Sequence, residues 1–214
     1  MHRPYLPTAI VLTCRSRSRQ SHGKMSSRPY GHRRTIRLSG YDYTRVGAYF
    51  ITILTYQRER SLCRIKREES HGATQGDACV TLTSAGEIAQ QCWDSIPEHF
   101  PHVSLGAFQI MPDHLHGIVI IDRPPPAPVK EEIRVGVHPD GRIMPTGRVP
   151  GSVGAIVSSY KSAVTKRVNE SRRTPGAKVW HGNYYERIIR DDGEHERIAR
   201  YIAENPIKWL AGER

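Results

Sequence analysis

The chain has 214 residues, of which 37% are hydrophobic, and a formal net charge of +11 from 32 Lys and Arg against 21 Asp and Glu. This length predicts one well-cored domain with extensions and disfavours two ordinary domains. No stretch approaches the roughly 18 uninterrupted apolar residues of a membrane span, so no membrane partner is expected. The positive charge favours a polyanionic partner, because Lys and Arg release counterions from phosphate backbones. A merely basic soluble protein is the alternative.

The four cysteines are widely and unevenly spaced, and no two of them form a CxxC pair. This spacing indicates neither a zinc site nor a secreted disulfide framework. A reducing cytoplasm is therefore the expected location.

The first 46 residues predict a basic N-terminal arm. Residues 1–46 contain nine Arg and one Lys against a single acid, Asp42. Such a run is usually solvated and often contacts nucleic acid, and its candidate DNA contacts are Arg33, Arg34 and Arg37. The remaining residues, 47–214, are expected to form the domain.

The domain opens with a strand and a helix. Residues 48–55 (AYFITILT) are aromatic and β-branched, which predicts a strand. Residues 57–80 are polar and contain glycine, so a loop is expected, with a short strand near its end. Ser84 and Glu87 form a capping-box pattern, and apolar residues then recur at helical spacing until Pro97 ends the segment.

Two further strands, at 103–111 and 114–121, are predicted to form a hairpin through a tight connection at Pro112 and Asp113. The segment that follows, residues 122–150, holds seven of the fifteen prolines. It is expected to be a loop or flexible insertion in the domain.

The closing third predicts a helix, a strand and a second helix. The first helix has an apolar stripe of Val153, Ile156, Val157, Tyr160, Val164 and Val168, and its opposite side carries Lys161, Lys166 and Arg167. The strand covers 184–190, and the last helix begins near Asp191 or Asp192. This helix is expected to end at Asn205, because Pro206 disfavours helical geometry in the residue before it.

The order of these elements predicts an α+β fold: strand, helix, strand, strand, helix, strand, and one helix more. It matches the ferredoxin-like split βαβ arrangement, an antiparallel sheet with two helices on one face. The extra C-terminal helix carries Tyr201. Many unrelated functions use this fold, so the fold alone decides nothing about activity.

Two histidines share one face of the predicted strand at 114–121. Alternate side chains of a strand point to the same side, so His114 and His116 present two imidazoles next to each other. Two neutral imidazoles suit a divalent cation better than a pair of protons, since both cannot become charged cheaply. The alternative is a pair of ordinary histidines at the start of a buried strand.

Tyr201 and Asn205 are one turn apart on the predicted final helix and therefore share a face. A phenol with an amide one turn away offers a nucleophile and a metal-ligand oxygen at the same place. The alternative is that Ile198, Tyr201 and Ile202 form a core stripe, with Asn-Pro as a stop signal.

Several motifs together resemble the REP-associated tyrosine transposases, members of the HUH single-tyrosine family. The HUH segment of that family, in which an apolar residue separates two histidines, resembles MPDHLHGIVII. Its opening strand resembles YDYTRVGAYFITILTYQR, and its closing third resembles SSYKSAVTKRVNE followed by VWHGNYYERIIRDDGEHERIARYIAENPIKW. The resemblance covers about residues 33–209. The departures are residues 1–32 and the insertion at 122–150.

This resemblance implies a metal-dependent DNA transposase. Tyr201 would attack a scissile phosphate in single-stranded DNA, leaving a 5′-phosphotyrosine and a free 3′-hydroxyl, and the reverse reaction would rejoin DNA without ATP. His114 and His116 would hold Mg²⁺ or Mn²⁺, with Asn205 as a third ligand. Imidazole ligands favour Mn²⁺.

The resemblance also implies the partner. Family members recognise short palindromic DNA hairpins, which predicts a cytoplasmic, nucleoid-associated protein that is a monomer or a homodimer. Single-strand binding pairs a basic track with stacking aromatics. Further candidate DNA contacts are Lys161, Arg187 and Arg190, and the candidate stacking residues are Tyr184 and Tyr185.

Two other functions compete with this hypothesis. One is a non-catalytic nucleic-acid-binding module on the same ferredoxin-like fold. The other is a metal-dependent nuclease or phosphodiesterase that uses water as its nucleophile and forms no covalent adduct with DNA.

Overall fold

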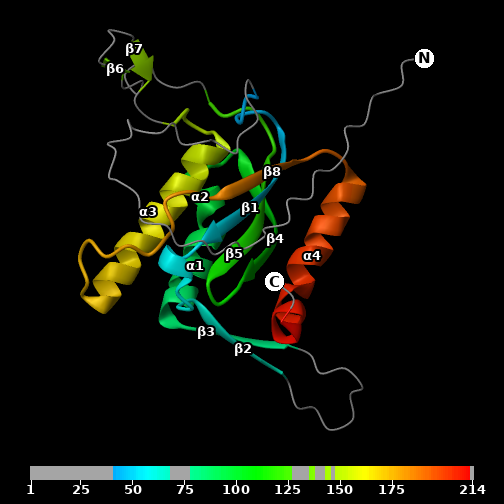
Figure 1. Ribbon diagram of the computed structural model, residues 1–214. Helices are drawn as coiled ribbons and strands as arrows, with labels where there is room; N and C mark the ends of the chain where they lie inside the picture. Colours follow the sequence, from blue (N-terminus) through cyan, green and yellow to red (C-terminus); the bar gives the residue numbers. More distant parts are fainter. Residues whose placement is uncertain (1–40, 68–77, 127–134, 138–142, 146–147, 213–214) are drawn as a thin grey trace, which may run out of the picture. The chain divides into compact units, whose positions relative to one another are not determined.

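A four-stranded antiparallel sheet with the order β4-β5-β1-β8 forms the centre of the fold (Figure 1). The computed structural model describes residues 41–67, 78–126, 135–137, 143–145 and 148–212, all of them in the unit 36–214. The elements are β1 (Gly47–Leu54), a 3-10 turn (Tyr56–Arg58), β2 (Cys63–Arg67), β3 (Ala78–Leu82), α1 (Ser84–Asp94), α2 (Ile96–His99), β4 (Val103–Ile110), β5 (His114–Ile121), β6 (Val135–Val137), β7 (Ile143–Pro145), α3 (Val153–Arg172), β8 (Tyr185–Ile189) and α4 (Asp192–Ala211).

The two faces of the sheet carry different helices. α1 and α3 pack on one face, and α4 lies on the other (Figure 1). The strand order and the two crossover helices are those of the split βαβ arrangement. The predicted α+β fold with an additional C-terminal helix is therefore confirmed.

β5 supplies side chains to both layers because successive residues of a strand point to opposite faces. Leu115 and Val119 belong to the main core under α1 and α3. Ile118 belongs to a smaller core that includes Ile202 of α4. His114 therefore shares the α4 face with Ile118.

The helices on the main-core face begin close to the predicted positions. The stripe predicted for α3 is buried, and Ser152 caps this helix by accepting from the Ala155 N–H. The predicted capping box of α1 is wrong by one residue, because the Thr83 hydroxyl accepts from the Gly86 N–H. Pro97 also does not end the helical region, since it occupies the first turn of the short helix α2.

The predicted end of α4 at Asn205 is wrong. The helix continues through Pro206 to Ala211 and ends where Gly212 adopts the left-handed conformation. A proline inside a helix removes one hydrogen bond and costs about 3 kcal/mol. Tertiary packing offsets this cost: Pro206 is buried, and the following turn carries Trp209 to within 6.1 Å of the His114 ring, measured between centroids.

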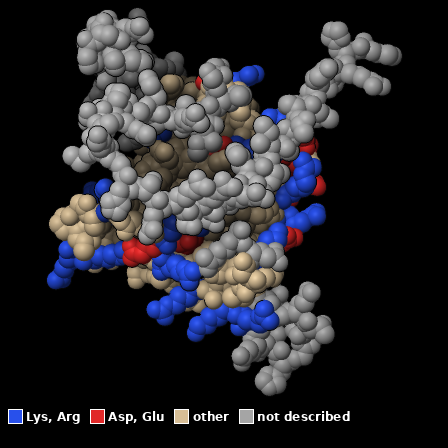
Figure 2. All heavy atoms as spheres, in the orientation of Figure 1, with Lys and Arg blue, Asp and Glu red and all other residues tan. Residues whose placement is uncertain are grey.

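Part of the predicted loop at 57–80 forms an antiparallel ribbon of β2 and β3. The exposed residues of β2 are Arg64, Lys66 and Arg67. Figure 2 shows Lys and Arg along the lower edge of the view, where Figure 1 has this ribbon. β3 is the short strand that was expected near the end of this segment, whereas β2 was missed because it is short and largely polar.

The predicted insertion at 122–150 contains a second small ribbon, β6 paired with β7. Much of the predicted N-terminal arm lies outside the described residues, including Arg33, Arg34 and Arg37. Where the description begins, Tyr41 and Tyr43 pack against the main core. In the described part of the chain, no helix has the length and apolar character needed to cross a bilayer.

The main core approaches β5 most closely at Gly117. A Cβ at this position would overlap the ring of Trp93, and that ring is stacked on Phe108. We expect Gly117→Ala to lower the free energy of unfolding by about 1–3 kcal/mol, the range for overpacked cores. Urea denaturation measures the loss. Gly182→Ala is the control, because a Cβ there has no atom within 4 Å, and equal losses in both variants would contradict the prediction.

Candidate functional site

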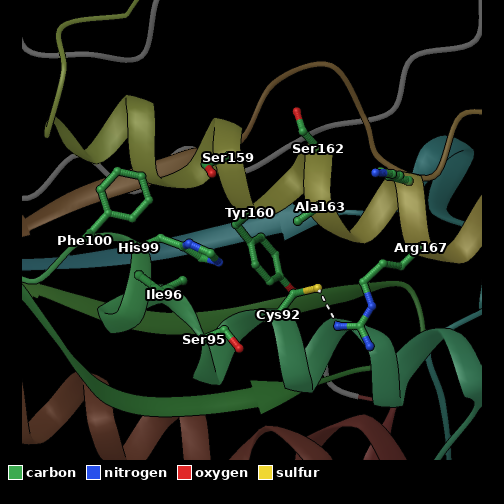
Figure 3. A pocket seen from close by; sticks show the side chains of 11 residues that line it. Cys92, Ser95, Ile96, His99, Phe100, Ser159, Tyr160, Ser162, Ala163 and Arg167 are labelled. Atoms are coloured by element: carbon green, nitrogen blue, oxygen red, sulfur yellow. Dashed lines mark hydrogen bonds between the residues drawn. The ribbon is translucent and has the colours of Figure 1, made fainter.

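A pocket of about 640 Å³ lies on the main-core side of the sheet, between α3 and the α1–α2 region (Figure 3). Its lining includes the buried Tyr160, whose hydroxyl donates to the Ala89 carbonyl oxygen. Arg167 reaches across the pocket to Cys92. None of the described residues predicted for catalysis, metal binding or DNA contact lines this pocket.

A second pocket, of about 570 Å³, lies on the α4 side. It is lined by Thr52, Leu54, Arg58, His114, His116, Tyr201, Asn205, Lys208 and Trp209. The residues come from β1, β5, α4 and the turn after β1. The structure thus brings the predicted nucleophile and all three predicted metal ligands into one pocket.

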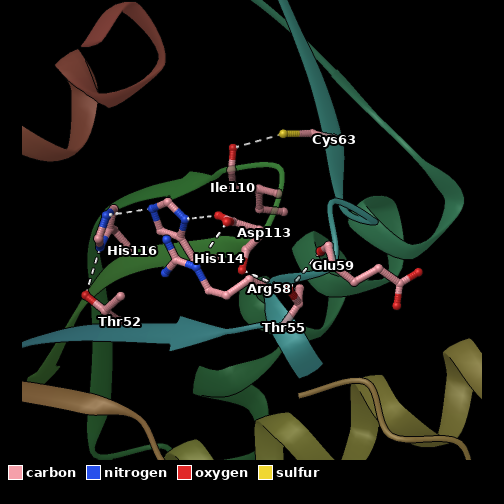
Figure 4. Close-up of polar contacts among 9 residues, drawn as sticks. All are labelled: Thr52, Thr55, Arg58, Glu59, Cys63, Ile110, Asp113, His114 and His116. Carbon is pink, nitrogen blue, oxygen red and sulfur yellow. Dashed lines mark hydrogen bonds and ion pairs between the residues drawn. The ribbon is translucent and has the colours of Figure 1, made fainter. Parts of the chain in front are cut away.

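The two histidines are held with their ring nitrogens facing each other (Figure 4). Nε2 of His114 is 3.1 Å from Nε2 of His116. On the far side of each ring, Nδ1 of His114 is 2.6 Å from an oxygen of Asp113, and Nδ1 of His116 is 2.8 Å from the hydroxyl of Thr52. Each ring is therefore fixed from behind by an oxygen.

Asp113 is itself held from two directions. Its second carboxylate oxygen is 3.2 Å from Nε of Arg58. Its backbone carbonyl accepts from both the N–H and the hydroxyl of Thr55. Arg58 has a left-handed φ of 59°, an uncommon conformation for a residue other than glycine. The turn after β1 therefore carries a guanidinium to the carboxylate that orients His114.

Burial keeps both imidazoles neutral. Burial, with a smaller contribution from the neighbouring His114, lowers the pKa of His116 to about 3. Burial also lowers the pKa of His114, although the adjacent Asp113 acts in the opposite direction. A neutral imidazole has one nitrogen with a lone pair. Because the Asp113 carboxylate accepts a hydrogen bond from the Nδ1–H of His114, the lone pair of that ring is on Nε2, toward the pocket.

The separation of the two Nε2 atoms fits a metal ion. Ligands about 2.1 Å from an ion, at neighbouring corners of an octahedron, are about 3.0 Å apart, close to the 3.1 Å observed. Among the described residues, no group of three or more His, Cys, Asp and Glu is arranged to hold an ion. Asn205, substrate oxygens or water would therefore have to complete the coordination. The side-chain N–H of Asn205 donates to the backbone carbonyl oxygen of Tyr201. The side-chain oxygen of Asn205, the atom that could bind a metal, is therefore not used in this hydrogen bond.

Tyr201 lies beside the histidine pair and faces solvent. Its ring centroid is 5.4 Å from that of His116 and 6.1 Å from that of Phe50. The side chain is 42% exposed, so the alternative of a core tyrosine is wrong. The Lys208 ammonium lies 5.5 Å from the centre of the phenol ring. This ammonium also forms an ion pair with Glu204, so a phosphate approaching the phenol would meet a cation whose charge is partly balanced.

The predicted DNA contacts are scattered. Arg187 lines a smaller neighbouring pocket with Tyr201 and Tyr185, and it forms an ion pair with Glu194. Arg190 is exposed in the connection between β8 and α4. Lys161 is on α3, across the sheet.

Lys161 and Tyr184 do not face the histidine pocket. The ammonium of Lys161 donates to the carbonyl oxygens of His181 and Gly182. Burial lowers the pKa of this lysine to about 8, and Arg148 adds to the effect. Tyr184 packs against the main core, so of the two predicted stacking tyrosines only Tyr185 lies near the pocket.

Five residues of the site were missed by the sequence analysis: Thr52, Arg58, Lys208 and Trp209, which line the pocket, and Asp113, which lies behind His114. Asp113 carried a signal, since an acid directly before the first histidine is within reach of its Nδ1. Thr52 carried none, because its position opposite His116 depends on the pairing of β1 with β5. Lys208 and Trp209 were missed because the predicted final helix ended at Asn205, three residues before Lys208.

The pKa of His116 predicts an acid-sensitive fold in protein freed of metal by a chelator. His116 becomes protonated below about pH 6.5 in the unfolded state, but only below about pH 3 in the folded state. The free energy of unfolding should therefore fall as the pH falls through this window, by at most about 1.4 kcal/mol per pH unit for one histidine. Urea denaturation between about pH 4 and 6 should show a shallower dependence in His116→Gln. An unchanged slope would contradict the assignment.

Comparison with known proteins finds similarity both in sequence and in structure. No family model matches the chain. Among solved structures, a REP-associated tyrosine transposase bound to a REP hairpin is similar over 81% of this chain and 74% of that chain, with 15% identity and a TM-score of 0.46. A protein of Deinococcus radiodurans provisionally named a transposase is similar over 79% of this chain and 97% of that chain, with 16% identity and a TM-score of 0.36. Because both TM-scores are below 0.5, the assignment of the fold is based on the strand order of the sheet instead.

The relative in sequence is a protein of Haemophilus influenzae that bears the name "Uncharacterized protein". The two sequences are 35% identical over 179 residues, which cover 83% of this chain and 90% of the relative. The chain therefore belongs to the same family as this Haemophilus influenzae protein.

Proposed function

We propose that the protein is a single-tyrosine HUH transposase that cleaves and rejoins single-stranded DNA at palindromic hairpins. The observation that carries this proposal is the pocket in which the exposed phenol of Tyr201 lies beside the paired imidazoles of His114 and His116. The sequence motifs that resemble this family supply the substrate, a DNA hairpin.

The reaction follows from the nucleophile. The Oη atom of Tyr201 forms a bond to the scissile phosphorus, and the bond from phosphorus to the 3′ oxygen breaks. The phenol loses its proton and the departing oxygen gains one, so the products are a 5′-phosphotyrosine and a free 3′-hydroxyl. Reversal onto another 3′ end rejoins the strand, because the phosphotyrosine retains the energy of the broken bond.

The pocket has the charges that this reaction requires. A phenol with a reference pKa near ~10 attacks poorly unless its surroundings help. Arg58 and Lys208 bring positive charge to the walls that a phosphate would approach. His114 and His116, with Asn205, would hold Mg²⁺ or Mn²⁺, which supplies Lewis-acid polarisation of the phosphate when bound. The exposure of Tyr201 leaves it accessible to a macromolecular substrate.

A covalent adduct tests this proposal. Incubation with Mn²⁺ and a labelled single-stranded hairpin with its flanking sequences should give a protein–DNA band that survives a denaturing gel. Tyr201→Phe removes only the hydroxyl and should abolish this band. Tyr185→Phe is the matched control, since it removes a hydroxyl from another exposed tyrosine, on β8.

The outcomes separate the three functions. Cleavage without an adduct, persisting in Tyr201→Phe, would favour a nuclease that uses water. Binding of the hairpin without cleavage in any divalent metal would favour a non-catalytic module.

Metal binding can be measured without DNA. Titration of chelator-treated protein with Mn²⁺, followed by calorimetry or electron paramagnetic resonance, should show one site. The double variant His114→Ala, His116→Ala should lose this site. Asp113→Asn should weaken Mn²⁺ binding by about 10- to 100-fold, because carboxylates behind metal-bound histidines orient the ring. Asp122→Asn is the control, since Asp122 is exposed, accepts from the Ser104 hydroxyl and lies at the opposite end of β5 from His114.

A further inference from the structure

We infer that the β2–β3 ribbon and Trp209 form the track along which single-stranded DNA enters the histidine pocket. The inference rests on the proposed function and adds the path of the substrate. Along this track, the ribbon binds backbone phosphates, and the indole of Trp209 stacks on a base next to the pocket.

The ribbon has the charge that a DNA backbone requires. Residues 58–67 contain five Arg and Lys and one acid, Glu59. Arg60, Arg64, Lys66 and Arg67 are all exposed. Figure 2 shows Lys and Arg gathered along the lower edge of the view, where this ribbon lies in Figure 1. Such a row suits phosphates, because neutralising them releases condensed counterions.

The ribbon is attached to the pocket itself. At its base, the Leu62 N–H donates to the Pro112 carbonyl oxygen and the Cys63 thiol to that of Ile110, so the start of β2 is tied to the residue before Asp113 and to the last residue of β4. Both strands also pack against α4. The row of cations therefore begins at Arg58, inside the pocket, and continues outward along β2.

Trp209 lies where the row enters the pocket. Its ring centroid is 6.1 Å from that of His114, and the guanidinium of Arg60 lies 5.4 Å from the centre of its ring. Proteins that bind single strands without base specificity combine a positive groove with aromatic rings, to which arginine adds cation–π contacts. An indole and a guanidinium at the mouth of a catalytic pocket match this combination.

The rival surface is a groove of about 610 Å³ along α3, which Arg148, Lys161, Lys166 and Lys178 help to line. It lies across the sheet from the histidine pair, so a strand bound there could not pass the phenol of Tyr201 without leaving the groove. Lys161 is also engaged by two backbone carbonyls. For these reasons the ribbon is the better track.

Salt dependence of binding distinguishes the two surfaces. The ribbon variant combines Arg64→Gln, Lys66→Gln and Arg67→Gln. The matched control combines Lys166→Gln, Arg172→Gln and Lys178→Gln, three exposed cations near α3. Fluorescence anisotropy with a mixed-sequence single-stranded oligonucleotide, in chelator, gives the slope of log K against log salt. The ribbon variant should reduce this slope by about two, at roughly 0.7 for each lost phosphate contact. The control should leave it near the wild-type value.

The base contact has an optical readout. The chain has three tryptophans, and Trp93 and Trp180 are only 2% and 6% exposed. Saturating oligonucleotide should quench the emission of the wild type through Trp209, and Trp209→Phe should bind DNA without this quenching. Trp209→Leu should weaken binding on the order of tenfold, as expected for loss of one stacked base.

Several results would overturn the inference. They are an unchanged salt slope in the ribbon variant, a slope reduced equally in the control, or no quenching by saturating DNA. The covalent adduct of the wild-type protein reports separately on the proposed function. An adduct together with any of these results would contradict the DNA track but not the proposed function. A wild-type protein that binds no single-stranded DNA would contradict both hypotheses.

Discussion

The pairing of β5 with β1 and β4 determines which side chains face α4 and which face the main core. The side-chain period of a strand is two, so a shift of one residue would exchange the two sets. His114 and His116 would then enter the main core, and Leu115 and Val119 would leave it. In the observed register both layers are filled with apolar side chains, and both imidazoles face α4. The packing of the core and the position of the histidine pair therefore have the same cause.

Burial of two imidazoles requires partners, since a buried polar group without one costs about 1–3 kcal/mol. The chain of contacts from Thr52 through His116 and His114 to Asp113 meets this requirement. With no ion bound, Thr52 can donate to His116, His116 to His114, and His114 to Asp113, which satisfies every ring nitrogen. A hydroxyl also accepts hydrogen bonds. Thr52 can therefore reverse its role and let His116 turn a lone pair toward the pocket.

The parts of the fold with strong periodicity were predictable from the sequence. α3 follows this rule, because its apolar positions repeat every three to four residues, and β5 was predictable from its continuous apolar run at Ile118–Ile121. β3 of the ribbon was expected, but β2 and its pairing with β3 were not predictable, since β2 is mostly exposed and polar and its partner is eleven residues further along the chain. The length of α4 was also mispredicted: local rules end a helix before Pro206, and only contacts distant in sequence carry it onward. At the site, the roles of Tyr201, His114, His116 and Asn205 stay predictions, although the pocket unites the four residues. Thr52 and Arg58 needed the three-dimensional structure.

Gly117 has a mechanical consequence for the histidine next to it. Because it has no side chain, the ring of Trp93 lies directly against the backbone of β5, and Phe108 is stacked on that ring. The segment behind His116 is thus backed by rigid aromatic packing, and protein interiors resist such displacement. In a chelating pair the spacing of the donor atoms is called the bite. In the proposed metal site the bite would be stiffened from the hydrophobic side of the sheet, so selection among ions by size would originate in Trp93, on the opposite face from the two imidazoles.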